Sequence, residues 1–218
     1  YNSTSAVNNL NEFNMAEAIT KDLNPSYGSI QALKSRDTNV VAFCEDKVLK
    51  ILSNKDALFN SDGSKNLTAS SNVLGDAIGF SGDYGISSNP ESLAVDGYRM
   101  YFTDKQRNKV LRLSQDGLTP ISDIGMTSWF RDNLNKANEL VGSFDTIKGE
   151  YNLTLSHKDL YLNPSFGSEM AWVDNLASKT VSFSETTKGW VSFKSFVPEH
   201  AISCANEYYT FKGAKPWL

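Results

Sequence analysis

Cysteine and histidine are both scarce in this sequence, with two of each among 218 residues. A disulfide-stabilised scaffold uses more cysteine pairs, so Cys44 and Cys204, each in an apolar, strand-like context, are expected to be reduced. His157 and His200 stand alone, outside any H-x-x-x-H or H-E-x-x-H pattern. A zinc site would have to be assembled from distant residues, and we expect no metal site.

Features that define several other protein classes are also missing. No run of 18 apolar residues occurs, so we expect no membrane insertion. The sequence has no G-x-S-x-G motif and no phosphate-binding loop, and we expect neither a catalytic site nor a cofactor. Its 21 Lys and Arg residues are outnumbered by 25 Asp and Glu residues. The resulting net charge of -4 argues against a generally basic, nucleic-acid-binding surface.

Serine and asparagine are abundant instead, with 27 and 20 residues. Both residue types favour turns, which suits a fold with many short strands. The chain opens on YNSTSAVNNL, without an initiator methionine or a signal peptide, and closes on FKGAKPWL just after a turn. We therefore expect it to be part of a longer polypeptide.

A loose repeat runs through the sequence. Similar phrases begin at Phe102, Phe144 and Phe183, which lie 42 and 39 residues apart, with a shortened copy at Phe43 and a partial one at Tyr209. Each has an aromatic residue, a polar turn about five residues later, and then alternating apolar positions. A period near 40 residues with strand-like units is typical of propeller blades, which have about four strands each.

The clearest unit covers residues 90–122, PESLAVDGYRMYFTDKQRNKVLRLSQDGLTPIS. It contains the strands SLAVD, MYFTD and KVLRLS, separated by the turns DGYR and KQRN, and Gly97 is suited to a positive φ in the first turn. This phrase resembles blades of NHL-type and related six-bladed propellers. The sequence therefore predicts a mostly β fold of β-propeller-like repeats of antiparallel sheets, with one or two inserted helices and strands over more than a third of the residues.

Two segments have helical periodicity. Residues 127–141 place Phe130, Leu134, Ala137 and Val141 on one face, between candidate N-cap residues and a glycine stop. The other candidate is NMAEAITKDL, near the N-terminus.

The expected domain organisation has two parts. Residues 1–37 form a partly helical N-terminal extension, and residues 38–218 form a propeller-like domain of roughly four blades. Residues 60–90 are rich in Gly, Ser, Asn and Asp, which predicts a loop insertion within the first blade.

One short basic segment is a candidate site. Lys105, Arg107 and Lys109 alternate along a strand and its turn, so they are expected to share a face that contacts a polyanion such as DNA. The alternative is an ordinary solvated turn.

Aromatic residues suggest a second kind of site. Trp172, Trp190 and Trp217 are candidates for a sugar-stacking platform, although core packing is the simpler explanation. The segment SGDYGISS from Ser81 partly matches the turn box of sialidase-type propellers but has Ser88 where the box has Trp. It is expected to be a structural turn.

Longer stretches of the sequence are similar to known structural proteins. GDYGISSNPESLAVDGYRMYFTDKQRNKVLRLSQDGLTPISDIGMTSWFRDNL, then EYNLTLS, KTVSFSETTKGWVSFKSFVPEH and ANEYYTFKGAKPW, resemble the C-terminal part of large virion proteins of tailed bacteriophages, including crAss-like phages. Those proteins lie near the portal and tail and are described as stabilisation, nozzle or muzzle proteins. The resemblance covers roughly residues 80–218 and includes no catalytic motif.

This resemblance implies a function and a set of partners. It implies a virion structural component at the tail nozzle or neck, forming a ring, commonly sixfold, around the DNA exit channel. The partners would be other copies of the chain and neighbouring portal and tail proteins, with transient passage of DNA and assembly in the bacterial host cytoplasm. Two alternatives are a receptor- or glycan-binding propeller module, which would bind a host receptor, and a glycan-cleaving propeller enzyme, which would need converging carboxylates.

Overall fold

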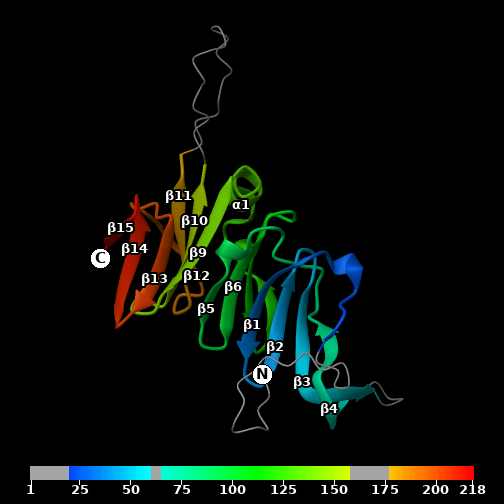
Figure 1. The fold of residues 1–218 in the computed structure, drawn as a ribbon. Helices are drawn as coiled ribbons and strands as arrows, with labels where there is room; N and C mark the ends of the chain where they lie inside the picture. The colour runs from blue at the N-terminus through cyan, green and yellow to red at the C-terminus, as the bar shows by residue number, and fades with distance from the viewer. Residues whose placement is uncertain (1–19, 60–64, 158–176) are drawn as a thin grey trace, which may run out of the picture. The chain divides into compact units, whose positions relative to one another are not determined.

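The computed structural model describes residues 20–59, 65–157 and 177–218 and divides the chain into two compact units, Tyr1–Phe80 and Ser81–Leu218 (Figure 1). Strands dominate these residues, which confirms the predicted mostly β class. All four sheets are antiparallel and join strands in chain order. No helix in the described ranges is long and apolar enough to cross a membrane.

The first unit is one four-stranded sheet with the order β1-β2-β3-β4. Its strands are β1 (Ile30–Arg36), β2 (Asn39–Cys44), β3 (Val48–Phe59) and β4 (Lys65–Gly79), preceded by the 3-10 turn η1 (Pro25–Tyr27). Alternating apolar residues of β2 and β3 bury one face of the sheet, where Leu23 and Tyr27 pack against Ala42, Cys44 and Leu49.

The second unit contains three sheets. Their strands are β5 (Ala94–Asp96), β6 (Arg99–Asp104), β7 (Lys109–Ser114) and β8 (Gly117–Pro120) in one; β9 (Glu139–Asp145), β10 (Glu150–Ser156), β11 (Lys179–Ser184) and β12 (Gly189–Lys194) in the next; and β13 (His200–Cys204), β14 (Glu207–Lys212) and β15 (Lys215–Trp217) in the last. The short helical elements are η2 (Pro90–Ser92), η3 (Ile121–Asp123) and α1 (Thr127–Asn133).

Tight turns explain why consecutive strands pair. Gly97 has a φ of +55° between β5 and β6, as the sequence predicts, and Gly149 has a φ of +63° between β9 and β10. Such left-handed positions match the twist of hairpins. The repeated phrases of the sequence correspond to hairpins, because each spans one pair of adjacent strands: β2–β3, β6–β7, β9–β10, β11–β12 or β14–β15.

The sheets of the second unit contact one another through their first strands. Strands β5 and β13 both contact β9, which has six of its seven residues buried (Figure 1). The largest core lies between the β5–β8 and β9–β12 sheets, where Tyr101, Phe144 and Tyr151 stack and Phe130 of α1 packs on Trp190. This core fixes the two sheets face to face.

The predicted helix over residues 127–141 is wrong beyond its first half. Helix α1 ends at Asn133, and Glu139–Asp145 is strand β9. Leu140 and Phe144 of this strand join the core between the sheets, and Gly142 lies against a backbone carbonyl. Tertiary packing of the alternating residues therefore outweighs the helical spacing that also passes through them.

Other boundaries also differ from the sequence prediction. The expected loop insertion at residues 60–90 contains β4, which pairs with β3, so the serine and asparagine residues of this segment partly lie in a strand. Strand β1 lies within residues 1–37, where an extension is expected. Most of the candidate helix NMAEAITKDL falls outside the described residues, and residues 20–23 are not helical.

The repeated phrase corresponds to a hairpin and not to a whole four-stranded sheet. The phrases at Phe144 and Phe183 belong to one sheet, with the order β12-β11-β10-β9, although the sequence places them in two successive blades. The two hairpins together form this four-stranded sheet, whereas the β5–β8 sheet contains a single phrase.

Candidate functional site

The predicted basic strip lies at the turn between β6 and β7. Lys105 and Arg107 are in the turn and only Lys109 is in a strand, so the expected strand alternation does not place them on one face. Asn108 takes a φ of +54° and closes this turn.

Each cation of the strip has a partner within the chain. The ammonium of Lys105 donates to the carbonyl of Ala137 at 2.6 Å, and that of Lys109 pairs with Asp123 at 2.5 Å. The guanidinium of Arg107 pairs with Asp104 at 3.0 Å. Contact with a polyanion stays a prediction, and it would have to compete with these interactions.

Asp104 is the last residue of β6, directly before this turn, and its side chain is fully buried. Its carboxylate accepts hydrogen bonds from the backbone and the side chain of Arg107, both at 3.0 Å. It also accepts from the backbone of Gly85 and the hydroxyl of Ser87, both at 3.2 Å. The SGDYGISS segment is therefore a turn anchored on β6, in agreement with the structural interpretation of its sequence.

A second charged cluster joins two sheets. Glu185, in the turn after β11, pairs with Arg112 at 2.7 Å and with Arg99 at 3.6 Å, and accepts a hydrogen bond from Tyr101 at 2.6 Å. Burial and the nearby carboxylate raise the pKa of Tyr101 far above its ordinary value, so its hydroxyl stays protonated and donates. The cluster ties the β5–β8 sheet to the β9–β12 sheet at the margin of their core.

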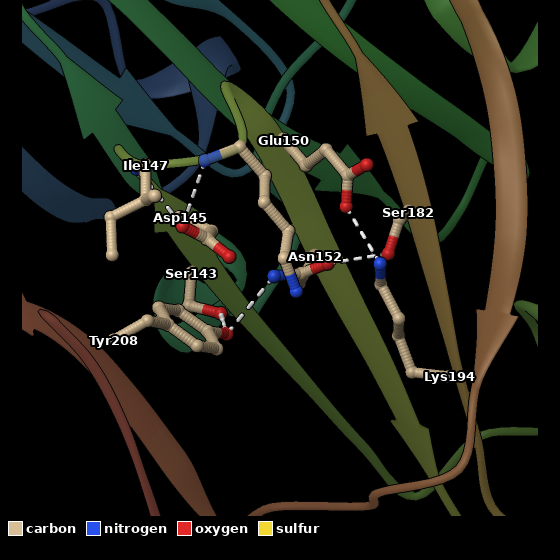
Figure 2. A network of polar contacts seen from close by, with 9 residues as sticks. Ser143, Asp145, Ile147, Glu150, Asn152, Ser182, Lys194 and Tyr208 are labelled. Carbon is tan, nitrogen blue, oxygen red and sulfur yellow. Dashed lines mark hydrogen bonds and ion pairs between the residues drawn. The ribbon is translucent and has the colours of Figure 1, made fainter. Parts of the chain in front are cut away.

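The opposite face of the β9–β12 sheet is polar. Ser143, Asn152 and Ser182 lie side by side on three adjacent strands, and all three are buried. Figure 2 shows Tyr208 of β14 reaching this row, where its hydroxyl lies 2.7 Å from that of Ser143 and accepts from the Asn152 amide at 3.1 Å. The hydroxyl of Ser182 donates to the other end of the same amide.

Two further groups of polar contacts lie on either side of this polar row (Figure 2). Lys194 pairs with Glu150 at 2.7 Å on one side, and on the other Asp145 accepts from the backbone of Ile147 and Lys148 in a turn. Burial raises the pKa of Tyr208, which keeps its hydroxyl neutral. The hydrogen bonds satisfy the buried polar atoms, so the row acts as a specific contact between sheets.

A groove of about 420 Å³ lies beside Tyr208. It is lined by Asp145, Ile147, Lys148, Phe196, Glu207, Tyr208, Thr210 and Leu218. No sequence pattern singles out these residues, because they come from turns and strands that are adjacent only in the folded chain.

The other candidate residues from the sequence do not form one site. Trp190 packs in the core and donates to the carbonyl of Ile121 at 2.9 Å, Trp217 is exposed on β15, and Trp172 lies outside the described residues. His157 directly follows β10, and burial lowers the pKa of its imidazole. His200 is exposed at the start of β13. Within the described ranges, no three His, Cys, Asp or Glu side chains are grouped as metal ligands.

The two cysteines differ in exposure, which gives a direct test of their state. Cys44 is buried on β2, where burial raises the pKa of its thiol, whereas Cys204 is exposed at the end of β13. A thiol reagent at neutral pH should modify one cysteine rapidly in the native protein and two after denaturation. Failure to find any thiol in the denatured protein would show that both are oxidised.

The described geometry is that of a scaffold, in which charged and aromatic clusters hold stacked antiparallel sheets together. The chain matches the family model of the crassvirus muzzle protein over residues 7–214 and belongs to that family. It is therefore a structural protein of a crAss-like bacteriophage, and the resemblance noted in the sequence is confirmed. No curated protein matches the chain.

Proposed function

We propose that the chain is a non-enzymatic component of the tail nozzle or neck, where copies assemble into a ring around the DNA exit channel. Membership of the muzzle family is the observation that carries this proposal. Neighbouring portal and tail proteins would be its other partners, and assembly would take place in the host cytoplasm. Internal contacts join the three sheets of the second unit, as a structural component requires.

We also propose that the sheets are blades of a propeller. Each is an antiparallel meander, and β5, β9 and β13 meet at their first strands, as inner strands of neighbouring blades do. A meander cannot bury both of its faces alone, so stacking supplies the core. This arrangement supports the proposed architecture within the second unit.

The charge distribution supports transient contact with DNA. A channel lined by many unpaired cations would release counterions from the duplex and bind it tightly. Here the net charge is -4, and Lys105, Arg107 and Lys109 all have internal partners. The glycan-binding alternative has less support, because Trp190 is committed to the core.

Localisation in the particle tests the proposal. We expect the protein in purified virions, with antibody or cryo-electron-microscopy density on the portal axis at the distal end of the tail. The turn of Gln115 and Asp116 between β7 and β8 is exposed and suited to an inserted epitope. Absence from virions, or presence only on fibres away from the axis, would refute this location.

A further inference from the structure

The last sheet, β13–β15, has two very different faces. Toward the β9–β12 sheet it presents small and polar side chains: Ala201 is buried, Ser203 donates to the carbonyl of Phe144 at 2.8 Å, and Tyr208 reaches the polar row. Strand alternation and the pairing register place another set on the opposite face. This outward face consists of His200, Ile202, Cys204, Glu207, Tyr209, Phe211 and Pro216.

The outward face is the more apolar of the two. Ile202 lies directly opposite Tyr209 on the neighbouring strand, and Phe211 lies opposite Pro216. Ile202 is 49% exposed, whereas Ala201 on the inner face is 5% exposed. A sheet normally buries its apolar face and leaves the polar one in water, so this face is suited to a partner.

The free edges of the second unit favour a partner that stacks on a face over one that adds a strand. Pro216 stands in the middle of the three-residue β15 and has no N–H to offer, and Pro120 ends the four-residue β8. Strand β12 is longer, but its pairing is irregular opposite Ser182 and Phe183 and it ends in Lys194. Short strands, prolines and irregularities at edges all oppose strand addition.

The contacts within the second unit indicate which surface of a partner would fit the outward face of the β13–β15 sheet. First strands contact first strands: β9 contacts β5 on the preceding sheet and β13 on the following one. Strand β1 is the first strand of its own sheet and exposes Ile30 (49%) and Leu33 (55%). A β1 placed beside β13 would continue the series and bring these apolar side chains to Ile202.

Charges near the two surfaces are opposite in sign, although the pairing register places Lys34 and Arg36 on the face of β1 opposite to Leu33. Lys34 and Arg36 of β1 have no ion-pair partner among the residues that the structure describes. Glu207 lies on the outward face and accepts a hydrogen bond from Tyr209, and Glu199 precedes β13. Neither carboxylate is paired with a cation in the described part of the chain.

We propose that the outward face of the β13–β15 sheet binds the β1 strand of a second copy of this chain. The interface is heterologous, because two different surfaces meet, and repetition of such a contact produces a ring or an open filament. This inference deepens the proposed ring and rests on it for its biological setting. The contact itself can be tested in solution, independently of where the protein lies in the particle.

The exposed Cys204 is a natural probe of this contact. In Leu33→Cys, a short bismaleimide should join Cys204 of one copy to the new cysteine of another and give dimers and higher species on a denaturing gel. The buried Cys44 should contribute little. Leu33→Cys combined with Cys204→Ser should lose these species, and Val191→Cys, at a position 42% exposed on β12, should not produce them.

Substitution of Ile202 gives a second readout. Ile202→Asp should weaken self-association about ten-fold or more in analytical ultracentrifugation, because it places a charge in the apolar contact, whereas Val191→Asp should leave it unchanged. Cross-links that form only within one chain, or equally in Val191→Cys, would overturn the inference, as would an absence of dimers. A protein that cross-links as expected but is missing from the nozzle would contradict the proposed location alone.

Discussion

Gly142→Ala is expected to destabilise the protein by about 3 kcal/mol, near the upper end of the usual cost of overpacking a core. A Cβ at this position would lie 2.0 Å from the carbonyl oxygen of Ser92. That carbonyl cannot easily retreat, because Tyr151 donates to it at 2.9 Å. The Ser92 hydroxyl in turn donates to the carbonyl of Asn89 and accepts from the backbone of Thr103. The 3-10 turn η2 and strand β9 would have to move apart.

Thermal unfolding measures this effect, with a fall of roughly 6–12 °C in the midpoint expected for a domain of this size. Gly189→Ala is the matched control, because the nearest atom to its new Cβ is 3.8 Å away. An unchanged midpoint for Gly142→Ala would show that η2 does not pack against β9 as described.

Asp104→Ala is expected to cost about 3 kcal/mol, because it removes a buried acceptor of four hydrogen bonds. The backbone N–H of Gly85 and that of Arg107 would lose their hydrogen bonds to Asp104, and the guanidinium of Arg107 would lose its ion pair with Asp104. Arg107 is one-third exposed, so water compensates part of that loss. Asp104→Asn keeps one acceptor oxygen and should recover part of the stability.

Denaturant titration and hydrogen exchange at residues 85–87 measure the loss. Asp132→Ala is the control, since Asp132 also pairs with an arginine at 3.0 Å but both side chains are mostly exposed. Its stability should match that of the wild type. Equal effects of the two substitutions would mean that Asp104 does not anchor the SGDYGISS turn.

The strands of the β5–β8 sheet could be predicted from the sequence because local signals agree there. Gly97 marks the first turn, and short apolar runs bounded by polar turns, Met100–Phe102 and Val110–Leu113, mark β6 and β7. Residues 139–141 belong both to the helical pattern of residues 127–141 and to the alternating pattern of β9, and the choice depends on the core supplied by other sheets. The pairing of β10 with β11 joins two phrases that the sequence separates.

The contacts between sheets were less accessible to sequence reasoning. The cations of the basic strip could be listed, but their partners Asp123 and Ala137 are distant in the chain. The polar row of Ser143, Asn152 and Ser182 resembles any surface serine and asparagine pattern until β14 covers it. Register across strands, which a single sequence does not reveal, decides which side chains meet.

The chain-order pairing of the strands bears on how the protein forms during synthesis. Residues 94–120 contain a complete four-stranded sheet, and at roughly 5–20 residues per second a ribosome extends the chain by that length in about 1–5 s. Hairpins close in about 1–10 μs, far faster than the segment emerges. Each sheet can therefore pair its strands before the next is made, and the polar row of the β9–β12 sheet stays hydrated until β14 arrives. Because Ser143, Asn152 and Ser182 are compatible with water, this face does not promote aggregation of the nascent protein before β14 covers it.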